Sequence, residues 1–243
     1  MKRLAMSLVM LDVETIALGR LHYRQLRWES ESIALCEVDA HDERTAILGG
    51  STFQKLDLDP KALARLLEVD QFLSEEQIEQ SKLKSDPLRR FQFLIARALE
   101  TSLKTNRVLE KGQGLPCAYS SVSHSEWLIA TALSWHRKVG IDIQNHTAVN
   151  YKAIAQRVFR EKEGDRLQDG RVEDFFEIWA AKEALLKCSG EKLLSNLPSL
   201  LEILDSDEIL VKLRGYEYKV ISFRETCRSM NMPDCSFVLS VRI

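Results

Sequence analysis

Two apolar runs separated by a short turn, followed by a long helix, constrain the fold of this chain most strongly. Residues 128–135 (LIATALSW) have the composition of a buried strand, and residues 139–144 (VGIDIQ) read as the strand that returns after the turn. Residues 172–188 predict a helix that ends at Gly190, the residue type most common just beyond a helix C-terminus. The second half of the chain is therefore expected to combine strands with helices.

Local signals indicate further elements along the rest of the chain. Asp59-Pro60, a capping box from Ser74 to Gln77, and Asp86-Pro87 each mark the start of a helix. Further strands are expected at residues 4–10, 32–38, 200–204, 208–213, 216–223 and 236–241, and short helices at 150–159 and 161–167.

The composition excludes several classes of protein. Of the 243 residues, 45% are hydrophobic and the net charge is −2, which is typical of a globular chain of one large domain or two packed lobes. Near-neutral charge gives no support for nucleic-acid or membrane binding, and no stretch approaches the ~20 apolar residues that span a bilayer. Asp12 and Glu14 interrupt the first apolar run, so we interpret it as a strand and not as a signal peptide. The five scattered cysteines predict reduced thiols in a cytoplasmic protein.

The helix predicted after Asp86-Pro87 is unusually basic. From Lys82 to Lys111 there are eight Lys or Arg residues against three Asp or Glu, although the chain as a whole is negative. This excess is either a solvated basic face or a site for a polyanion such as a phosphate-bearing cofactor. Ser123-His124-Ser125, just before a predicted buried strand, is a second group that can donate to phosphate oxygens. The alternative for His124 is a structural cap.

Two acidic residues interrupt apolar patterns. Asp142 lies on the same strand face as Gly140, and burying an unpaired acid is costly; the alternative is a surface residue on a half-exposed strand. Glu183 falls one turn after Trp179 on the long helix and one turn before Lys187, and the alternative there is a plain surface ion pair with Lys187. Two inward carboxylates on separate elements form a site for a hard cation, which predicts Mg²⁺ shared with substrate phosphates.

Taken together, these segments resemble the 4′-phosphopantetheinyl transferases of the larger, surfactin-synthetase-activating (Sfp) type. The matching segments are residues 121–125 (SVSHS), 139–144 (VGIDIQ), 157–163 (RVFREKE) and 179–187 (WAAKEALLK), preceded by a basic helix at 90–97 (RFQFLIAR). Their order and spacing also resemble those of the family.

This resemblance implies an α+β fold with pseudo-twofold symmetry, in which two similar lobes each contain a small, mainly antiparallel sheet packed by helices. The amino-terminal lobe would span residues 1–116 and the carboxy-terminal lobe, with the metal-site motifs, residues 117–243. Coenzyme A would bind between the lobes of a monomer. The enzyme, a holo-[acyl-carrier-protein] synthase, would transfer 4′-phosphopantetheine to a serine of an apo acyl or peptidyl carrier protein and release adenosine 3′,5′-bisphosphate.

The resemblance also implies roles for individual residues. Asp142 and Glu183 would hold Mg²⁺, Glu183 would act as general base, and Lys187 would neutralise the leaving phosphate. Gln144 stands where many relatives have a second acid, so either its amide oxygen or a water would fill that metal position. The coenzyme A contacts would be His124, Ser123, Arg89, Arg90, Arg97, Lys182 and Lys187. Carrier docking would involve Lys152, Arg157, Phe159 and Arg160.

Two other functions remain open on the residues alone. A coenzyme A-binding or carrier-docking protein without catalysis is one, and Gln144 is the residue that favours it. Another metal-dependent phosphotransferase or phosphatase is the second, and the order of the motifs disfavours it. The family's Gly-Lys-Pro loop appears here as Gly114-Leu115-Pro116, without its lysine.

Overall fold

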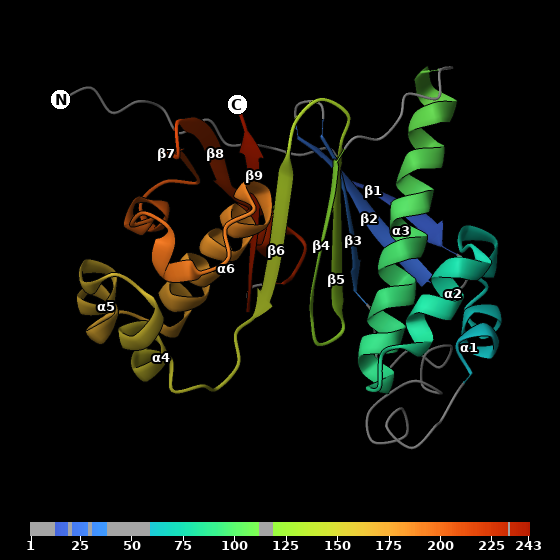
Figure 1. Cartoon of the computed structure of the whole chain (residues 1–243), viewed down its shortest axis with the longest axis horizontal. Coiled ribbons are helices and arrows are strands. Elements are labelled where there is room, and N and C mark those ends of the chain that lie inside the picture. The colour runs from blue at the N-terminus through green and yellow to red at the C-terminus, as the bar shows by residue number, and fades with distance from the viewer. Residues whose placement is uncertain (1–12, 19–20, 29–30, 38–58, 112–118, 233) are drawn as a thin grey trace.

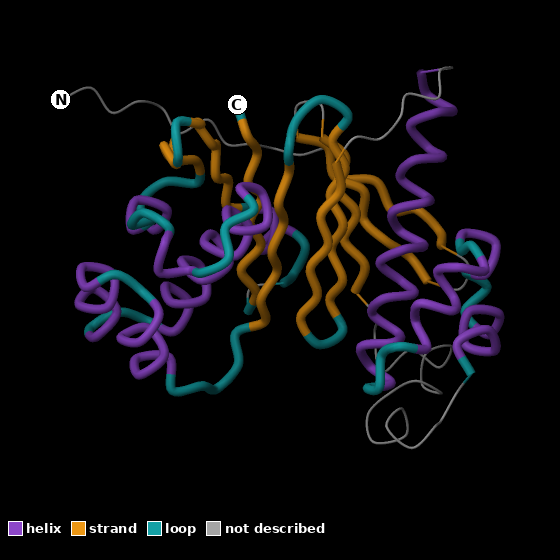
Figure 2. Tube along the Cα trace, viewed as in Figure 1, coloured by secondary structure: helices purple, strands orange, loops and turns teal. Residues whose placement is uncertain are grey.

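The computed structural model describes residues 13–18, 21–28, 31–37, 59–111, 119–232 and 234–243. Two sheets lie side by side at its centre, and helices cover their outer faces (Figure 1). The same arrangement is clear when the trace is coloured by secondary structure (Figure 2). The prediction of an α+β fold with two antiparallel sheets packed by helices is confirmed.

The first sheet has five strands in the order β1-β2-β3-β5-β4, and every neighbouring pair is antiparallel. Its strands are β1 (Val13–Leu18), β2 (Leu21–Trp28), β3 (Glu31–Glu37), β4 (Tyr119–Ser125) and β5 (Leu128–Ser134). The helices beside it are α1 (Pro60–Leu66), α2 (Glu75–Lys82) and α3 (Pro87–Lys111), with the short 3₁₀ turn η2 (Asp70–Phe72).

The second sheet has four antiparallel strands in the order β6-β9-β8-β7. Its strands are β6 (Val139–Asn145), β7 (Glu208–Leu213), β8 (Tyr216–Ser222) and β9 (Cys235–Arg242). Its helices are α4 (Tyr151–Val158), α5 (Glu161–Gln168), α6 (Val172–Ser189) and α7 (Arg224–Ser229), with 3₁₀ turns η3 (Leu194–Asn196) and η4 (Leu201–Leu204). No described helix is both long enough and apolar enough to cross a membrane.

Buried apolar side chains form three clusters that hold these layers together. The first joins the outer face of the first sheet to α3, where Phe91 and Leu94 are fully buried. The second lies between the two sheets and includes Leu35 and Ile141. The third joins the second sheet to α6. Burial of one such side chain stabilises the fold by about 1.5–3 kcal/mol. The many buried side chains between the two sheets therefore hold the sheets in a fixed relative position.

Several helix ends follow the local signals in the sequence. The Asp59 side chain accepts bonds from the first amides of α1, and the Ser74–Gln77 capping box begins α2. Gly190 ends α6 with a φ of +77°, a left-handed conformation that glycine adopts without the strain of a side chain.

The strand predictions need corrections. β6 is not a hairpin partner of β5, because β5 pairs with β3 and β4 whereas β6 begins the other sheet beside β9. Residues 200–204, predicted as a strand, contain the 3₁₀ turn η4 and its N-cap Leu200; Leu200 and Ile203 are buried at a spacing of three residues. The predicted strand 4–10, the Gly114-Leu115-Pro116 loop and the lobe boundary at 116/117 lie outside the described residues. Both strands that follow this boundary, β4 and β5, belong to the first sheet.

Candidate active site

Helix α6 approaches strand β6 so closely that only glycine fits at one position of the strand. A Cβ atom added at Gly140 would lie 2.1 Å from the Ala184 carbonyl oxygen and 2.6 Å from the Cys188 amide nitrogen. Side chains alternate along a strand, so Asp142 points to the same face as Gly140 and therefore toward α6. The helix backbone fills the space beside Gly140.

Asp142 is 2% exposed and has a partner on each carboxylate oxygen. Its Oδ1 accepts a bond from the Ser123 hydroxyl (2.6 Å) and one from the Lys187 ammonium (2.6 Å). Its Oδ2 accepts a bond from the Gln144 amide nitrogen (2.8 Å). The Lys187 ammonium also donates to the Ile141 carbonyl (2.9 Å). These bonds offset the cost of burying the charge, so the exposed alternative for Asp142 does not apply.

Glu183 lies on α6 one turn before Lys187 and is half-buried. Burial raises the pKa of its carboxyl group, and the negative charge of Asp142 raises this pKa further, while Lys187 opposes the shift. Within the described residues Glu183 makes no hydrogen bond or ion pair. The alternative for Glu183, a surface ion pair with Lys187, therefore does not apply, because Lys187 pairs with Asp142.

Strand β4 contributes to the site through both of its faces. Ser123, 5% exposed, faces β6 and Asp142. On the opposite face Val122 and His124 line a cavity together with residues of α3. The cavity volume is about 140 Å³, and its wall contains Lys84, Arg89, Gln92, Phe93, Ala96, Arg97, Val122 and His124. It is thus a basic cavity with room for a phosphate group.

The pKa of His124 responds to charges from both the basic cavity and the residues around Asp142. Burial lowers the pKa of this imidazole, and the positive charges of Arg89 and Lys187 lower it further, whereas Asp142 acts in the opposite direction. The lowered pKa favours the neutral imidazole of His124, which can donate one hydrogen bond. Because Arg89 lines the cavity and Lys187 bonds Asp142, the basic cavity adjoins the acid pair across β4.

The structure separates other residues that the sequence grouped with coenzyme A. Arg90 lies outside the cavity wall, and its guanidinium donates to the Lys84 carbonyl (3.3 Å). Lys182 is fully buried and pairs with the equally buried Glu163, 3.0 Å away. Its ammonium also donates to the Pro198 carbonyl (3.0 Å). Lys182 therefore ties α6 to α5, and its ammonium is not exposed to a ligand.

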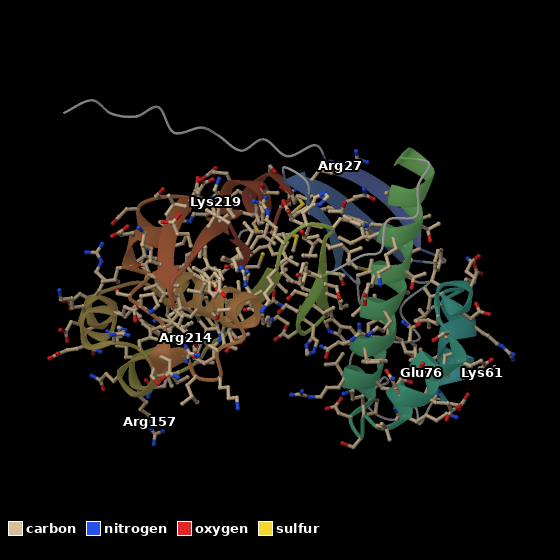
Figure 3. All side chains as sticks on the ribbon, turned by 45° about the horizontal axis from the view of Figure 1, so that its top comes forward. Arg27, Lys61, Glu76, Arg157, Arg214 and Lys219 are labelled. Carbon is tan, nitrogen blue, oxygen red and sulfur yellow. The ribbon has the colours of Figure 1, made fainter. Side chains whose placement is uncertain are left out.

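The residues expected to dock a carrier protein divide into a buried and an exposed group. Phe159 is 8% exposed, and its ring packs against those of Phe175 (5.6 Å) and Trp179 (6.0 Å), so it is a core residue. Lys152, Arg157 and Arg160 are exposed. Arg157 points outward beneath α4 (Figure 3). Any docking by this region would depend on the basic side chains.

Sequence reasoning missed Lys84 and Phe93, which also line the cavity. The Phe93 ring is flanked by the Lys84 ammonium (5.5 Å to the ring centre) and the Arg97 guanidinium (5.2 Å). Phe93 has the spacing of the apolar face of the helix, so its residue type alone does not mark a binding site. The overlooked signal is the four-residue spacing from Phe93 to Arg97, which places a cation beside an aromatic ring on a helix.

The donor set around Asp142 is chemically suited to Mg²⁺. No cluster of three or more His, Cys, Asp or Glu side chains that could hold a metal occurs in the described parts of the chain. Mg²⁺, however, is commonly held by one or two carboxylates with waters and substrate phosphates. Asp142 and Glu183 supply the two carboxylates, and after burial the negative charge of Asp142 is the second cause that raises the pKa of Glu183. The metal contact expected from Gln144 stays a prediction, since its amide nitrogen faces Asp142.

Comparison with known proteins agrees with this geometry. The family model for the 4′-phosphopantetheinyl transferase superfamily matches residues 138–226, which include Asp142, Glu183 and Lys187. Residues 138–226 are therefore similar to that superfamily. A curated relative, 4′-phosphopantetheinyl transferase gsp of Aneurinibacillus migulanus, is 36% identical over 75 residues. That match covers 29% of this chain and 31% of the relative, so the chain is aligned with less than a third of that protein.

The superfamily segment contains only part of the candidate site. Strand β6 and helix α6 lie within it, whereas β4 and the basic helix α3 precede it. Asp142 and Glu183, the acid pair, therefore lie within the segment that matches the superfamily, and the residues that line the basic cavity precede it.

Proposed function

We propose that the chain transfers 4′-phosphopantetheine from coenzyme A to a serine hydroxyl of an apo acyl or peptidyl carrier protein, with Mg²⁺. The observation that supports the proposal most is the position of β4. On one face of this strand His124 lines the basic cavity, and on the other face the Ser123 hydroxyl donates to Asp142. A phosphate bound in the cavity thereby adjoins the acid pair. The superfamily match is to transferases of this kind.

The proposed reaction is a substitution at phosphorus. The serine oxygen bonds to the β-phosphorus of coenzyme A, and the bridging bond to the α-phosphate breaks. Its electron pair leaves on adenosine 3′,5′-bisphosphate, and the serine proton goes to a base. Bound Mg²⁺ would supply Lewis-acid neutralisation of the pyrophosphate. Positioning and electrostatic stabilisation supply most of the acceleration in phosphoryl transfer.

The acidic residues and Lys187 have distinct roles in this proposal. Asp142 and Glu183 would hold the ion, and two carboxylates with one ammonium leave one net negative charge, which favours a cation. Glu183 accepts the serine proton, directly or through a water, because it is the carboxylate without a hydrogen bond within the described residues. Its raised pKa brings it nearer to the working pH, as a general base requires. Lys187 neutralises the leaving phosphate.

The basic cavity would bind the phosphates of coenzyme A. Arg89 and Arg97 present guanidinium groups suited to phosphate, and the Arg97 group is already oriented by Glu100, 2.7 Å away. The neutral His124 donates a further bond. The exposed Lys152, Arg157 and Arg160 are proposed to face the carrier, where charge attraction increases the rate of encounter.

The proposal is tested by the intact mass of candidate apo carriers after incubation with coenzyme A and Mg²⁺. We expect a phosphopantetheine adduct that Asp142→Asn and Glu183→Gln abolish. Glu173→Gln is the matched control, because Glu173 is an exposed acid at the start of the same helix. Adduct formation that is undiminished in both site variants would refute the assignment. Coenzyme A binding without transfer to any carrier would instead indicate a binding protein.

A further inference from the structure

The two sheets meet at a seam made by three serines. Among the described strands, β4 is last in the order of the first sheet and β6 is first in that of the second, so neither has a ladder partner on its outer edge. The hydroxyls of Ser121, Ser123 and Ser125 accept bonds from the backbone amides of Ile141 (3.1 Å), Ile143 (3.3 Å) and Asn145 (3.0 Å). Each pair is 20 residues apart, so the two strands run in the same direction.

This seam explains why alternate residues of β4 are serines. Amides that point toward a neighbouring strand recur every second residue, and a buried amide without an acceptor costs free energy. Here a side-chain oxygen takes the place of the carbonyl oxygen of an ordinary ladder. A hydroxyl that accepts a bond still has one proton to donate.

Of the three seam serines, only Ser123 donates its hydroxyl proton to a carboxylate. Its hydroxyl donates to Asp142 Oδ1 at 2.6 Å while it accepts from the Ile143 amide. Among the described residues, Ser121 and Ser125 contact no carboxylate through their hydroxyls. Ser123 is thus the point at which the contact between the sheets reaches the acid pair.

We propose that Ser123 is a positioning residue for Asp142. This inference rests on the function proposed above, and it assigns to Ser123 a role other than contact with coenzyme A. The Ser123 hydroxyl is already used by two bonds and is 5% exposed, which leaves it no free proton for a phosphate. Its bond to Oδ1 fixes the rotation of the Asp142 carboxylate, because Gln144 and Lys187, the other partners, are longer and more exposed side chains.

The expected effect follows from the behaviour of groups that orient metal ligands. Loss of such an outer partner typically lowers metal affinity or activity about 10–100-fold. In Ser123→Ala, Asp142 Oδ1 loses one of its two donors at a site that water reaches poorly. We therefore expect the Mg²⁺ concentration for half-maximal transfer to rise ~10-fold or more. The KM for coenzyme A should change less than about twofold, because the cavity lies on the other face of β4.

The experiment compares three alanine variants of the full chain. Ser121→Ala and Ser125→Ala are matched controls, because each removes one seam bond and leaves Asp142 untouched. Ser121→Ala and Ser125→Ala should each lower Tm by roughly 2–4 °C, the effect of one lost hydrogen bond in a chain of this size, and Ser123→Ala, which loses two bonds, should lower it further. A second readout without turnover is calorimetric titration of each variant with Mg²⁺ in the absence of carrier. Only Ser123→Ala should weaken binding, and Ser123→Thr, which keeps the hydroxyl, should restore it.

Each outcome has a defined meaning. If the wild type transfers phosphopantetheine and the three alanine variants share one Mg²⁺ dependence, Ser123 is only a seam residue and the inference is overturned. If Ser123→Thr resembles Ser123→Ala while folding normally, the hydroxyl is not responsible, which also overturns it. A wild type that transfers to no carrier would refute the proposed function and this role with it. A Mg²⁺ defect confined to Ser123→Ala supports both.

Discussion

Gly140→Ala tests whether the close approach of α6 to β6 builds the candidate site. The added Cβ would lie 2.1 Å from the Ala184 carbonyl oxygen, and non-bonded atoms pack at about 3.5–4.0 Å. The helix would therefore have to retreat from the strand by more than about 1 Å. Both contacting atoms belong to the helix backbone, so no side-chain rotation relieves the overlap. Overpacking of this kind costs about 1–3 kcal/mol.

The same displacement would separate Asp142 on β6 from Glu183 and Lys187 on α6. A misplacement of about 1 Å near reacting groups can lower catalysis ~100-fold. We expect Gly140→Ala to lower Tm by roughly 2–12 °C, from 1–3 kcal/mol at 2–4 °C per kcal/mol. The rate of transfer to the carrier, measured by intact mass well below the Tm, should fall ~100-fold.

Gly164→Ala is the control for the helix approach. A Cβ at Gly164, inside α5, would have its nearest neighbour at 3.9 Å, an ordinary contact. Replacement of a helical glycine by alanine gains up to about 1 kcal/mol, so this variant should match or exceed the wild-type Tm. The reasoning is refuted if Gly140→Ala keeps wild-type Tm and wild-type transfer. A loss of stability with no loss of transfer would show that the approach serves packing alone.

Three further predictions follow from the charged groups. Lys182→Met leaves Glu163 buried without its cation and should lower the free energy of unfolding by ~3–5 kcal/mol in urea titrations, and combination with Glu163→Gln should recover most of the loss. Folding raises the pKa of Glu183 above its ordinary value of 4.5, so the wild type loses stability as the pH rises through this raised pKa and the carboxyl group ionises. Glu183→Gln has no such charge. The variant should therefore melt at a higher temperature than the wild type at pH 7 and lose this advantage below pH 4.5, and an equal Tm at both pH values would contradict the shift. Coenzyme A phosphate near His124 should raise its lowered pKa, so binding near pH 6 should take up a proton, an uptake that calorimetry in two buffers detects and that His124→Ala removes.

Local sequence signals predicted the helices better than the pairing of the strands. Asp59, the Ser74–Gln77 box and Gly190 act within one turn of their own helices, so a short stretch of sequence contains the whole interaction. Pairing of β5 with β3 joins residues such as Ser32 and Leu133 that are far apart along the chain. No local pattern distinguishes that pairing from a hairpin with β6, so the sequence predicted the neighbour nearest in the chain.

The sequence predicted those site residues that interrupt an apolar pattern and missed those that fit the pattern of a core residue. Asp142 and Glu183 were recognisable because each replaces an apolar residue in a regular pattern. Ser123 was assigned to phosphate because a polar run before a strand has no visible acceptor of its own. Its acceptor is Asp142, and its donor is the edge of the other sheet. Phe93 has the periodicity of a core residue, so the cavity beside it was not predictable from α3 alone.

Asp142 is held from two independent directions, which has a consequence for how the site responds to change. Ser123 fixes one side through the seam between the sheets, and Lys187 fixes the other through α6, whose distance is set by Gly140. Either constraint alone leaves the carboxylate oxygen Oδ1 with one donor. Residues that share a partner show non-additive effects, typically by 0.5–3 kcal/mol. Removal of the second constraint should therefore cost more after the first is gone, which makes the acid pair dependent on both sheets at once.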